Sequence, residues 1–215
     1  MNLKSFGCSF IFGTELSDIT NRTKKYSQLT WPALIAQRLG LKYSCYANAG
    51  SGNLQILNNV LDQAAQHSPN DIYIINWTFT NRWDYIYAGN NQWHSIRAWD
   101  THDRAEFYYR HFQAEYTDKL NNLIWINCAL QALQAQGAKF CMTYMDSLLF
   151  DSRWNTSPGI TQLQRQIKPH LHLFDNANFI EWSQRNGYPI SPVEDHPLEL
   201  AHEQAANYLM NHSLV

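Results

Sequence analysis

Short apolar runs alternate along the chain with segments whose apolar residues repeat at the period of an α-helix. The expected strands cover residues 2–10, 41–47, 71–77 and 139–145, and the expected helices cover residues 31–39, 54–66, 118–136 and 197–211. The run at 71–77 is almost continuously apolar, as in a central strand that is buried on both faces. Strands that alternate with helices predict βαβ units, and therefore an α/β fold with a mainly parallel sheet.

Capping signals mark the ends of two of these helices. Thr30 stands at the expected N-cap of the first, Pro32 lies in its first turn, and Gly40 follows its last turn. Thr117 and Gly137 flank the long helix in the same way. Both helices are therefore expected to begin and end near these residues.

Two segments do not fit the alternation. Residues 78–116 are crowded with tryptophan, tyrosine and phenylalanine but show no clean period of 2 or 3.6. A segment of this kind predicts an insertion or lid over a pocket rather than a sheet element, because long loops are usually functional or disordered. Residues 146–178 give only a weak helix prediction, around residues 161–166.

Composition narrows the class of protein. The chain has 215 residues, 45% of them hydrophobic and 16% charged, with a formal net charge of -2. This length suits one domain, 1–215, and the mean hydropathy of -0.45 argues against an integral membrane protein. Without an excess of positive charge, neither nucleic acid nor a membrane surface is an expected partner. The oligomeric state stays open.

The cellular compartment is inferred from the cysteines and the N-terminus. Cys8, Cys45, Cys128 and Cys141 are widely spaced and lie in apolar runs, as buried free thiols do. The apolar stretch before Gly13 is too short for a signal peptide, and no apolar span is long enough for a transmembrane helix. A reducing, cytoplasmic location is therefore expected.

Two residues at opposite ends of the chain could carry acid–base or nucleophilic chemistry. Ser9 stands at the end of the first strand, where open α/β sheets bind ligands, although it could also be an ordinary turn serine. His196 precedes the last helix and follows Glu194 and Asp195, although it could also be a solvated loop histidine. A nucleophilic serine needs an imidazole to take its proton and a carboxylate to orient that imidazole.

Polar and glycine-rich turns after the second and third strands could stabilise negative charge. Gly50, Gly52 and Asn53 follow the second strand, and Thr78 and Asn81 follow the third. Acyl transfer needs N–H or amide donors fixed where an oxyanion develops. The alternative is a glycine turn with a helix cap in the first case and ordinary loop polarity in the second.

The order of these pieces resembles the SGNH (GDSL-like) hydrolase superfamily along nearly the whole chain. Gly7-Cys8-Ser9-Phe10 with Gly13 looks like its first block in a Gly-Cys-Ser-Phe form, Asn48 to Asn53 looks like the second block, and His196-Pro197 with His202 looks like the last. The resemblance implies a three-layer α/β/α sandwich of flavodoxin-like type, with an aromatic insertion after the third strand.

The resemblance also implies roles for the site residues. Ser9 would be the nucleophile and an oxyanion donor, and His196 would be the base. The second donor would be Gly50 or, if the gap in the alignment with the second block is shifted, Gly52. The sequence departs from the pattern of the family at two positions. Thr78 or Asn81 must replace the usual oxyanion asparagine. The usual acid position holds Val193, so that Glu194, or the adjacent Asp195, would serve instead. The alternative is a Ser-His dyad assisted by a backbone carbonyl.

The function implied is a serine esterase that hydrolyses a short acyl ester of a small molecule or glycan, such as an O-acetyl group on a carbohydrate. No cofactor and no metal are expected. The alternative is a catalytically silent module that binds a glycan or a protein partner through its aromatic residues. A third class, a metallohydrolase using His170, His172, His196 and His202, lacks a zinc-like spacing.

Overall fold

The computed structural model describes residues 1–19 and 25–212. Its centre is a parallel sheet of five strands in the order β2-β1-β3-β6-β7. The strands are β1 (Asn2–Phe6), β2 (Lys42–Cys45), β3 (Ile72–Trp77), β6 (Lys139–Tyr144) and β7 (Leu171–His172). The chain changes direction across the sheet between β1 and β3, so ligands are expected beyond the carboxyl ends of these two strands.

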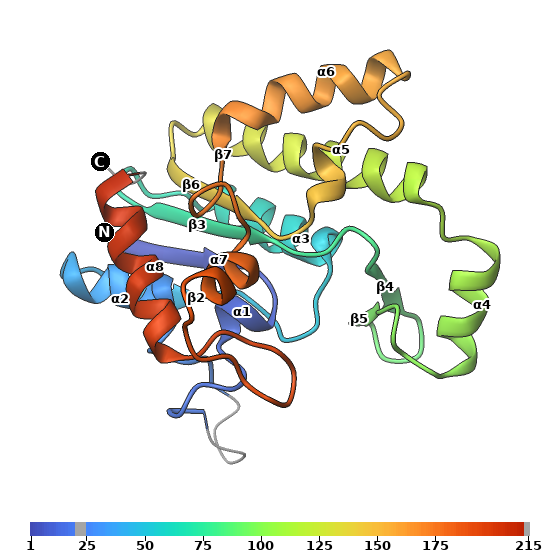
Figure 1. The fold of residues 1–215 in the computed structure, drawn as a ribbon. Helices are drawn as coiled ribbons and strands as arrows, with labels where there is room; N and C mark the ends of the chain where they lie inside the picture. Colours follow the sequence, from blue (N-terminus) through green and yellow to red (C-terminus); the bar gives the residue numbers. More distant parts are fainter. Residues whose placement is uncertain (20–24, 213–215) are drawn as a thin grey trace.

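Helices cover both faces of the sheet and complete the three layers (Figure 1). One face carries α2 (Trp31–Arg38), α7 (Phe179–Arg185) and α8 (Glu199–His212); the other carries α3 (Asn53–Ala64), α5 (Glu115–Ala135) and α6 (Pro158–Ile167). Alternate residues of β3 divide between two apolar clusters: Ile72 and Ile74 pack with the first group, and Tyr73 and Ile75 with the second. The expected α/β/α sandwich is confirmed.

The expected strand over residues 2–10 ends at Phe6, and a short helix, α1 (Ser9–Phe12), follows it. It ends because Gly13 adopts a left-handed conformation with φ 79°. A Cβ at this position would lie 2.5 Å from Cβ of Ser27, so a side chain would be both strained and crowded. One turn of helix therefore reverses the chain close to the end of β1.

The aromatic insertion, residues 78–116, contains a hairpin of β4 (Trp83–Tyr87) and β5 (Gln92–Ile96) and the helix α4 (Asp103–His111). The expectation that this segment holds no sheet element is wrong. Its aromatic rings stack on one another, as Trp83 does on Tyr85 and Tyr108, and this replaces burial against the main sheet. Figure 1 shows α4 standing outside the sandwich beside the hairpin.

Several other helices differ from the prediction. The helix α5 begins at Glu115 with Ala114 as N-cap, ahead of Thr117, because Asp118 already donates its N–H to the carbonyl of Ala114. The weakly predicted helix near residue 161 is present as α6, and short 3-10 turns lie at Ser147–Leu149 and Lys168–His170. The helix α7 was not predicted, although Asn178 and Glu181 form a capping box at its start.

The four cysteines are free thiols. Cys8 and Cys141 are buried as expected, Cys45 is half-buried, and Cys128 is exposed on α5, against expectation. Within residues 1–19 and 25–212, no helix combines the length and the apolar character needed to cross a membrane.

Candidate active site

Ser9 is the first residue of α1, at the carboxyl end of β1. The tight path between strand and helix depends on Gly7, because a Cβ there would lie 2.5 Å from Cγ1 of Ile11 and 3.2 Å from the carbonyl oxygen of Asn76. The N–H at the first position of a helix has no intrahelical acceptor, which leaves the N–H of Ser9 free to face a ligand.

His196 approaches Ser9 from the other end of the chain. Its Nε2 lies 2.7 Å from Oγ of Ser9, and the ring makes an edge contact with Phe10 at a centroid distance of 4.8 Å. The loop that carries it is closed at its base: Ser191 donates its N–H to the carbonyl of His196, and Ile190 pairs with Pro197. These bonds fix the imidazole although the loop itself lies at the surface.

Glu15 holds the other side of the imidazole. One of its carboxylate oxygens lies 2.5 Å from Nδ1 of His196, and the other accepts a hydrogen bond from Oγ of Ser191. Partial burial alone would raise the pKa of Glu15, but the hydrogen bonds from Ser191 and His196 outweigh it and hold this pKa below its usual range. Glu15 is therefore a carboxylate at neutral pH.

Sequence reasoning did not identify Glu15. The signal available was an acidic residue shortly after the glycine that ends α1, where a left-handed turn brings the chain back toward the serine. Of the expected acids, Glu194 lies with a carboxylate oxygen 3.7 Å from Nδ1 of His196, and its side chain is 60% exposed. Asp195 is exposed, has a left-handed φ of 56°, and lines the cavity that contains Ser9 and His196.

The turn after β2 lies directly against the end of β1. Oγ of Ser51 donates to the carbonyls of Gly7 and Asn48, and the N–H of Ser51 closes the turn onto Asn48. Gly50 occupies the left-handed position of this turn, with φ 81°, and lines the cavity that contains Ser9. The structure thus brings Ser9, His196 and Gly50 together.

The remaining expected donors make bonds within the protein and are not among the residues that line this cavity. The N–H of Gly52 donates to Asp84. The buried Asn53 amide joins the backbone of Thr78 to the side chain of Asn122. Oγ1 of Thr78 donates to Sγ of Cys8 at 3.3 Å. The carbonyl of Asn81 accepts a hydrogen bond from Tyr109.

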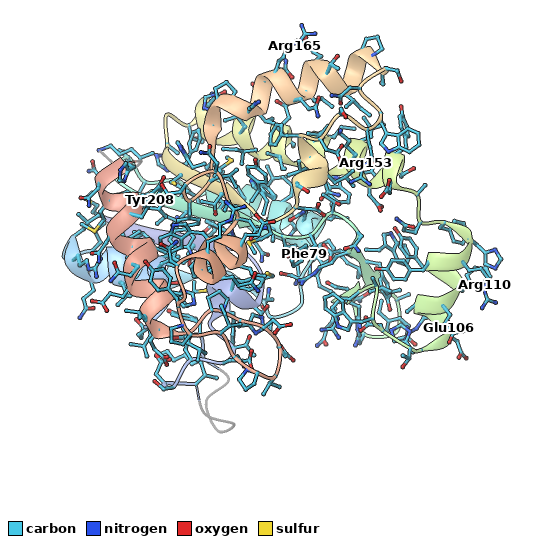
Figure 2. The ribbon with its side chains drawn as sticks, viewed as in Figure 1. Phe79, Glu106, Arg110, Arg153, Arg165 and Tyr208 are labelled. Atoms are coloured by element: carbon cyan, nitrogen blue, oxygen red, sulfur yellow. The ribbon has the colours of Figure 1, made fainter. Side chains whose placement is uncertain are left out.

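The cavity around Ser9 and His196 has a volume of about 700 Å³. Besides the residues above, its walls include Phe79, Arg82, Arg97 and Trp99 of the aromatic insertion. Figure 2 shows Phe79 between the sandwich and the hairpin. The two arginines were not predicted as site residues, because nothing local in the sequence indicates which insertion side chains face the cavity.

The other histidines of the last block and of β7 have separate environments. His202 is fully buried, and its Nδ1 accepts a hydrogen bond from the N–H of Trp31. Burial lowers the pKa of His202 to about 3, so this histidine is neutral and caps α2. His172, on β7, has its pKa lowered by burial and by the neighbouring His170.

Ligand atoms of Glu15, Glu194 and His196 lie within 4.8 Å of one another, and this is the one group in the described residues that could hold a metal ion. Binding there would displace the hydrogen bond between Nδ1 of His196 and Glu15. The observed hydrogen-bond geometry therefore suits proton transfer better than metal coordination.

Known proteins resemble this chain in structure and not in sequence. No protein-family model and no curated protein matches the chain. The psychrotrophic esterase EstA from Pseudoalteromonas sp. superposes with a TM-score of 0.56 at 11% identity, over 98% of this chain and 94% of EstA. A protein assigned to the G-D-S-L lipolytic family from Desulfitobacterium hafniense DCB-2 gives 0.53 at 11% identity, over 98% of both chains.

A carbohydrate esterase, whose active site is described as having divergent catalytic and non-catalytic binding functions, gives a TM-score of 0.52 at 15% identity. The match covers 98% of this chain and 67% of that one. This chain therefore has the fold of G-D-S-L esterases, with Ser9 and His196 in contact at the edge of the sheet where such folds bind ligands.

Proposed function

We propose that this protein is a serine ester hydrolase of the SGNH type, with Ser9 as nucleophile, His196 as general base and Glu15 as the orienting acid. The observation that carries the proposal is the continuous hydrogen-bonded relay from Oγ of Ser9 through the imidazole to Glu15. Glu15 would take the place that the sequence assigns to Glu194 or Asp195, because its carboxylate is closer to Nδ1 and less exposed.

In the acylation step, Nε2 of His196 accepts the hydroxyl proton as Oγ of Ser9 attacks the ester carbonyl. The imidazolium that forms donates through Nδ1 to the carboxylate of Glu15, which stabilises its charge. His196 then gives the proton to the leaving alcohol. In the second half, water loses a proton to His196 and attacks the acyl-enzyme. His196 then returns this proton to Oγ of Ser9 as the acid is released.

The backbone N–H groups of Ser9 and Gly50 would stabilise the oxyanion. Both belong to residues that line the cavity, and both are presented by tight backbone turns. Removing a single donor of this kind costs about 3 kcal/mol of transition-state stabilisation. Thr78 is the weaker candidate for a third donor, because its hydroxyl already donates to Cys8. Asn81 is also a weaker candidate, because it does not line the cavity.

The substrate we propose is a short acyl ester of a small molecule or a glycan. Trp99 is 59% exposed and lies in the cavity wall, where an indole face could stack on a sugar ring. The carbohydrate esterase with the same fold supports a glycan ester as a candidate. The aromatic insertion would then act as the side of the cavity that selects the substrate.

The test compares native protein with Ser9→Ala and His196→Ala in hydrolysis of 4-nitrophenyl acetate and in labelling by a fluorophosphonate. The native protein should hydrolyse the ester and carry the label on Ser9, and both variants should lose each property. EstA, which has this fold, is inhibited by monoethylphosphonate, and that supports the choice of probe.

The matched control is Ser68→Ala, which removes an exposed serine hydroxyl distant in sequence from the site. It should hydrolyse and label as the native protein does. A folded native protein that is neither labelled nor active would overturn the proposal and leave the silent glycan- or protein-binding module as the better account.

A further inference from the structure

We infer that the substrate of the proposed active site carries a negatively charged group, a carboxylate or phosphate, bound by Arg82. This inference names the substrate class of the site in the proposed function and rests on it. It starts from the burial of Arg82, which is 6% exposed and lines the same cavity as Ser9 and His196.

The guanidinium of Arg82 is incompletely satisfied. Its Nη1 donates to the carbonyl of Ser51 at 3.0 Å, but its Nε is buried and has no hydrogen-bond partner in the part of the chain that the structure describes. Within residues 1–19 and 25–212, no carboxylate lies within 4.0 Å of it. A buried cation with an unmade bond is costly unless a ligand supplies the missing acceptor.

The nearest acid in sequence is already occupied. Asp84 accepts hydrogen bonds from the N–H groups of Gly52 and Gln55 and from Oγ of Ser95. Its carboxylate is therefore directed at the start of α3 and at β5, and it leaves the guanidinium fork of Arg82 without a direct counterion.

A second arginine adds to the positive wall. Arg97 pairs with Asp100 through Nε and Nη2, and its Nη1 lies 3.5 Å from where a Cβ of Gly50 would be. Both guanidinium carbons lie over the ring of Trp99, at 5.6 Å for Arg82 and 5.4 Å for Arg97. The indole packs against both guanidinium groups. Because Arg97 is paired with Asp100, Arg82 is the arginine whose planar fork suits a carboxylate or phosphate.

The lining of the cavity also includes two acidic residues. These are Glu194 and Asp195, beside His196, and both are exposed. An anionic group is therefore favoured beside Arg82 and disfavoured beside these two acids.

The experiment measures kcat/KM for matched charged and neutral esters. The acyl-side pair is the mono-4-nitrophenyl ester of adipate and 4-nitrophenyl hexanoate; the alcohol-side pairs compare 4-acetoxybenzoate and 4-acetoxyphenyl phosphate with methyl 4-acetoxybenzoate. In at least one pair the native protein should favour the anion. Replacing Arg82 by Gln should lower that preference about 10- to 100-fold, the usual value of a charged hydrogen bond. The pair that responds identifies carboxylate or phosphate as the group.

Two further variants control for folding and for bulk charge. Arg82→Lys keeps a cation but loses the planar fork, so it should retain part of the preference. Arg110→Gln removes an exposed arginine on α4, outside the cavity (Figure 2), and should leave the preference unchanged. The inference would be overturned if Arg82→Gln and Arg82→Lys kept the native ratio of kcat/KM for the charged ester to that for the neutral ester. An equal loss of activity on both esters would count as an unchanged ratio.

Binding separates this inference from the proposed function. Adipate and inorganic phosphate are titrated into Ser9→Ala and into the double variant Ser9→Ala, Arg82→Lys, with calorimetry as the readout. Binding that weakens about 10-fold or more in the double variant supports the anion site even if the native protein hydrolyses no ester. Hydrolysis of neutral esters without any anion preference or anion binding would leave the function standing and reject the anion site.

Discussion

Glu15 and His196 are 181 positions apart in the chain, and a carboxylate oxygen of Glu15 lies 2.5 Å from Nδ1 of His196. Glu194, which is two positions from the histidine, is 3.7 Å from the same nitrogen. Closeness in sequence therefore does not decide which acid orients the imidazole. The loop geometry at the end of β1 decides it.

Replacing Glu15 by Gln should lower kcat/KM for 4-nitrophenyl acetate about 10²- to 10⁴-fold, because a neutral amide cannot stabilise the imidazolium. The Glu194→Gln variant is the matched control and should lose much less activity. Circular dichroism of both variants checks that the fold is retained. A larger loss in Glu194→Gln than in Glu15→Gln would make Glu194 the orienting acid.

Glu15 should also make stability depend on acid pH. Its pKa is lower in the folded state than in the unfolded state, so its contribution is complete above the ordinary glutamate pKa and is lost as pH falls through the folded pKa. The difference in unfolding free energy between native protein and Glu15→Gln, measured in urea, should shrink across that acid range. The exposed Glu203→Gln variant should show no such narrowing.

His202 should destabilise the fold as pH falls below neutrality. Its folded pKa of about 3 lies below the ordinary value of 6.5, so between these values the unfolded chain binds a proton that the folded chain does not. This lowers the unfolding free energy by up to about 1.4 kcal/mol per pH unit. In His202→Gln the slope over this range should be smaller, as urea titrations at several pH values would measure.

The control for this slope is Asn211→Gln, which changes an exposed side chain without an ionisable group near the end of α8. Its pH slope should follow that of the native protein. Equal slopes in His202→Gln and the native protein would show that the buried imidazole is protonated in the folded state.

Asp84 links the hairpin to the turn that carries Gly50. Replacing it by Asn should cost about 1–3 kcal/mol of unfolding free energy, because one of the buried N–H groups of Gly52 and Gln55 loses its acceptor. Urea denaturation measures the loss, and Asp62→Asn, on the exposed side of α3, is the control. Equal stability of the two variants would mean that the carboxylate adds nothing to the turn.

The sheet and the pairing of Ser9 with His196 could be predicted from the sequence. Apolar runs and cap residues locate the strands and most helices. Parallel strands also bring the ends of β1 and β3 to one edge, where the serine and the last loop meet. The strands and helices follow from periodicity, which local patterns record, whereas the pairing of Ser9 with His196 was expected from the resemblance in the order of the sequence blocks.

The positions of Glu15 and Arg82 in the site could not be predicted from the sequence, because they depend on tertiary geometry. Glu15 reaches the imidazole through a one-turn helix and the left-handed Gly13, and Arg82 reaches the cavity through a hairpin whose residues lack strict alternation. The hairpin packs its rings on one another and not on the main sheet, so the usual period of a half-buried strand is missing.

The turn that carries Gly50 is hydrogen-bonded to the aromatic insertion at two consecutive residues, Ser51 and Gly52. Arg82 donates to the carbonyl of Ser51, and Asp84 accepts from the N–H of Gly52. Cutting out or exchanging the insertion as a cassette would therefore remove two supports of the very loop that presents Gly50. Engineering a new preference should keep Arg82 and Asp84 in place and vary Trp99, the exposed ring of the insertion that lines the cavity.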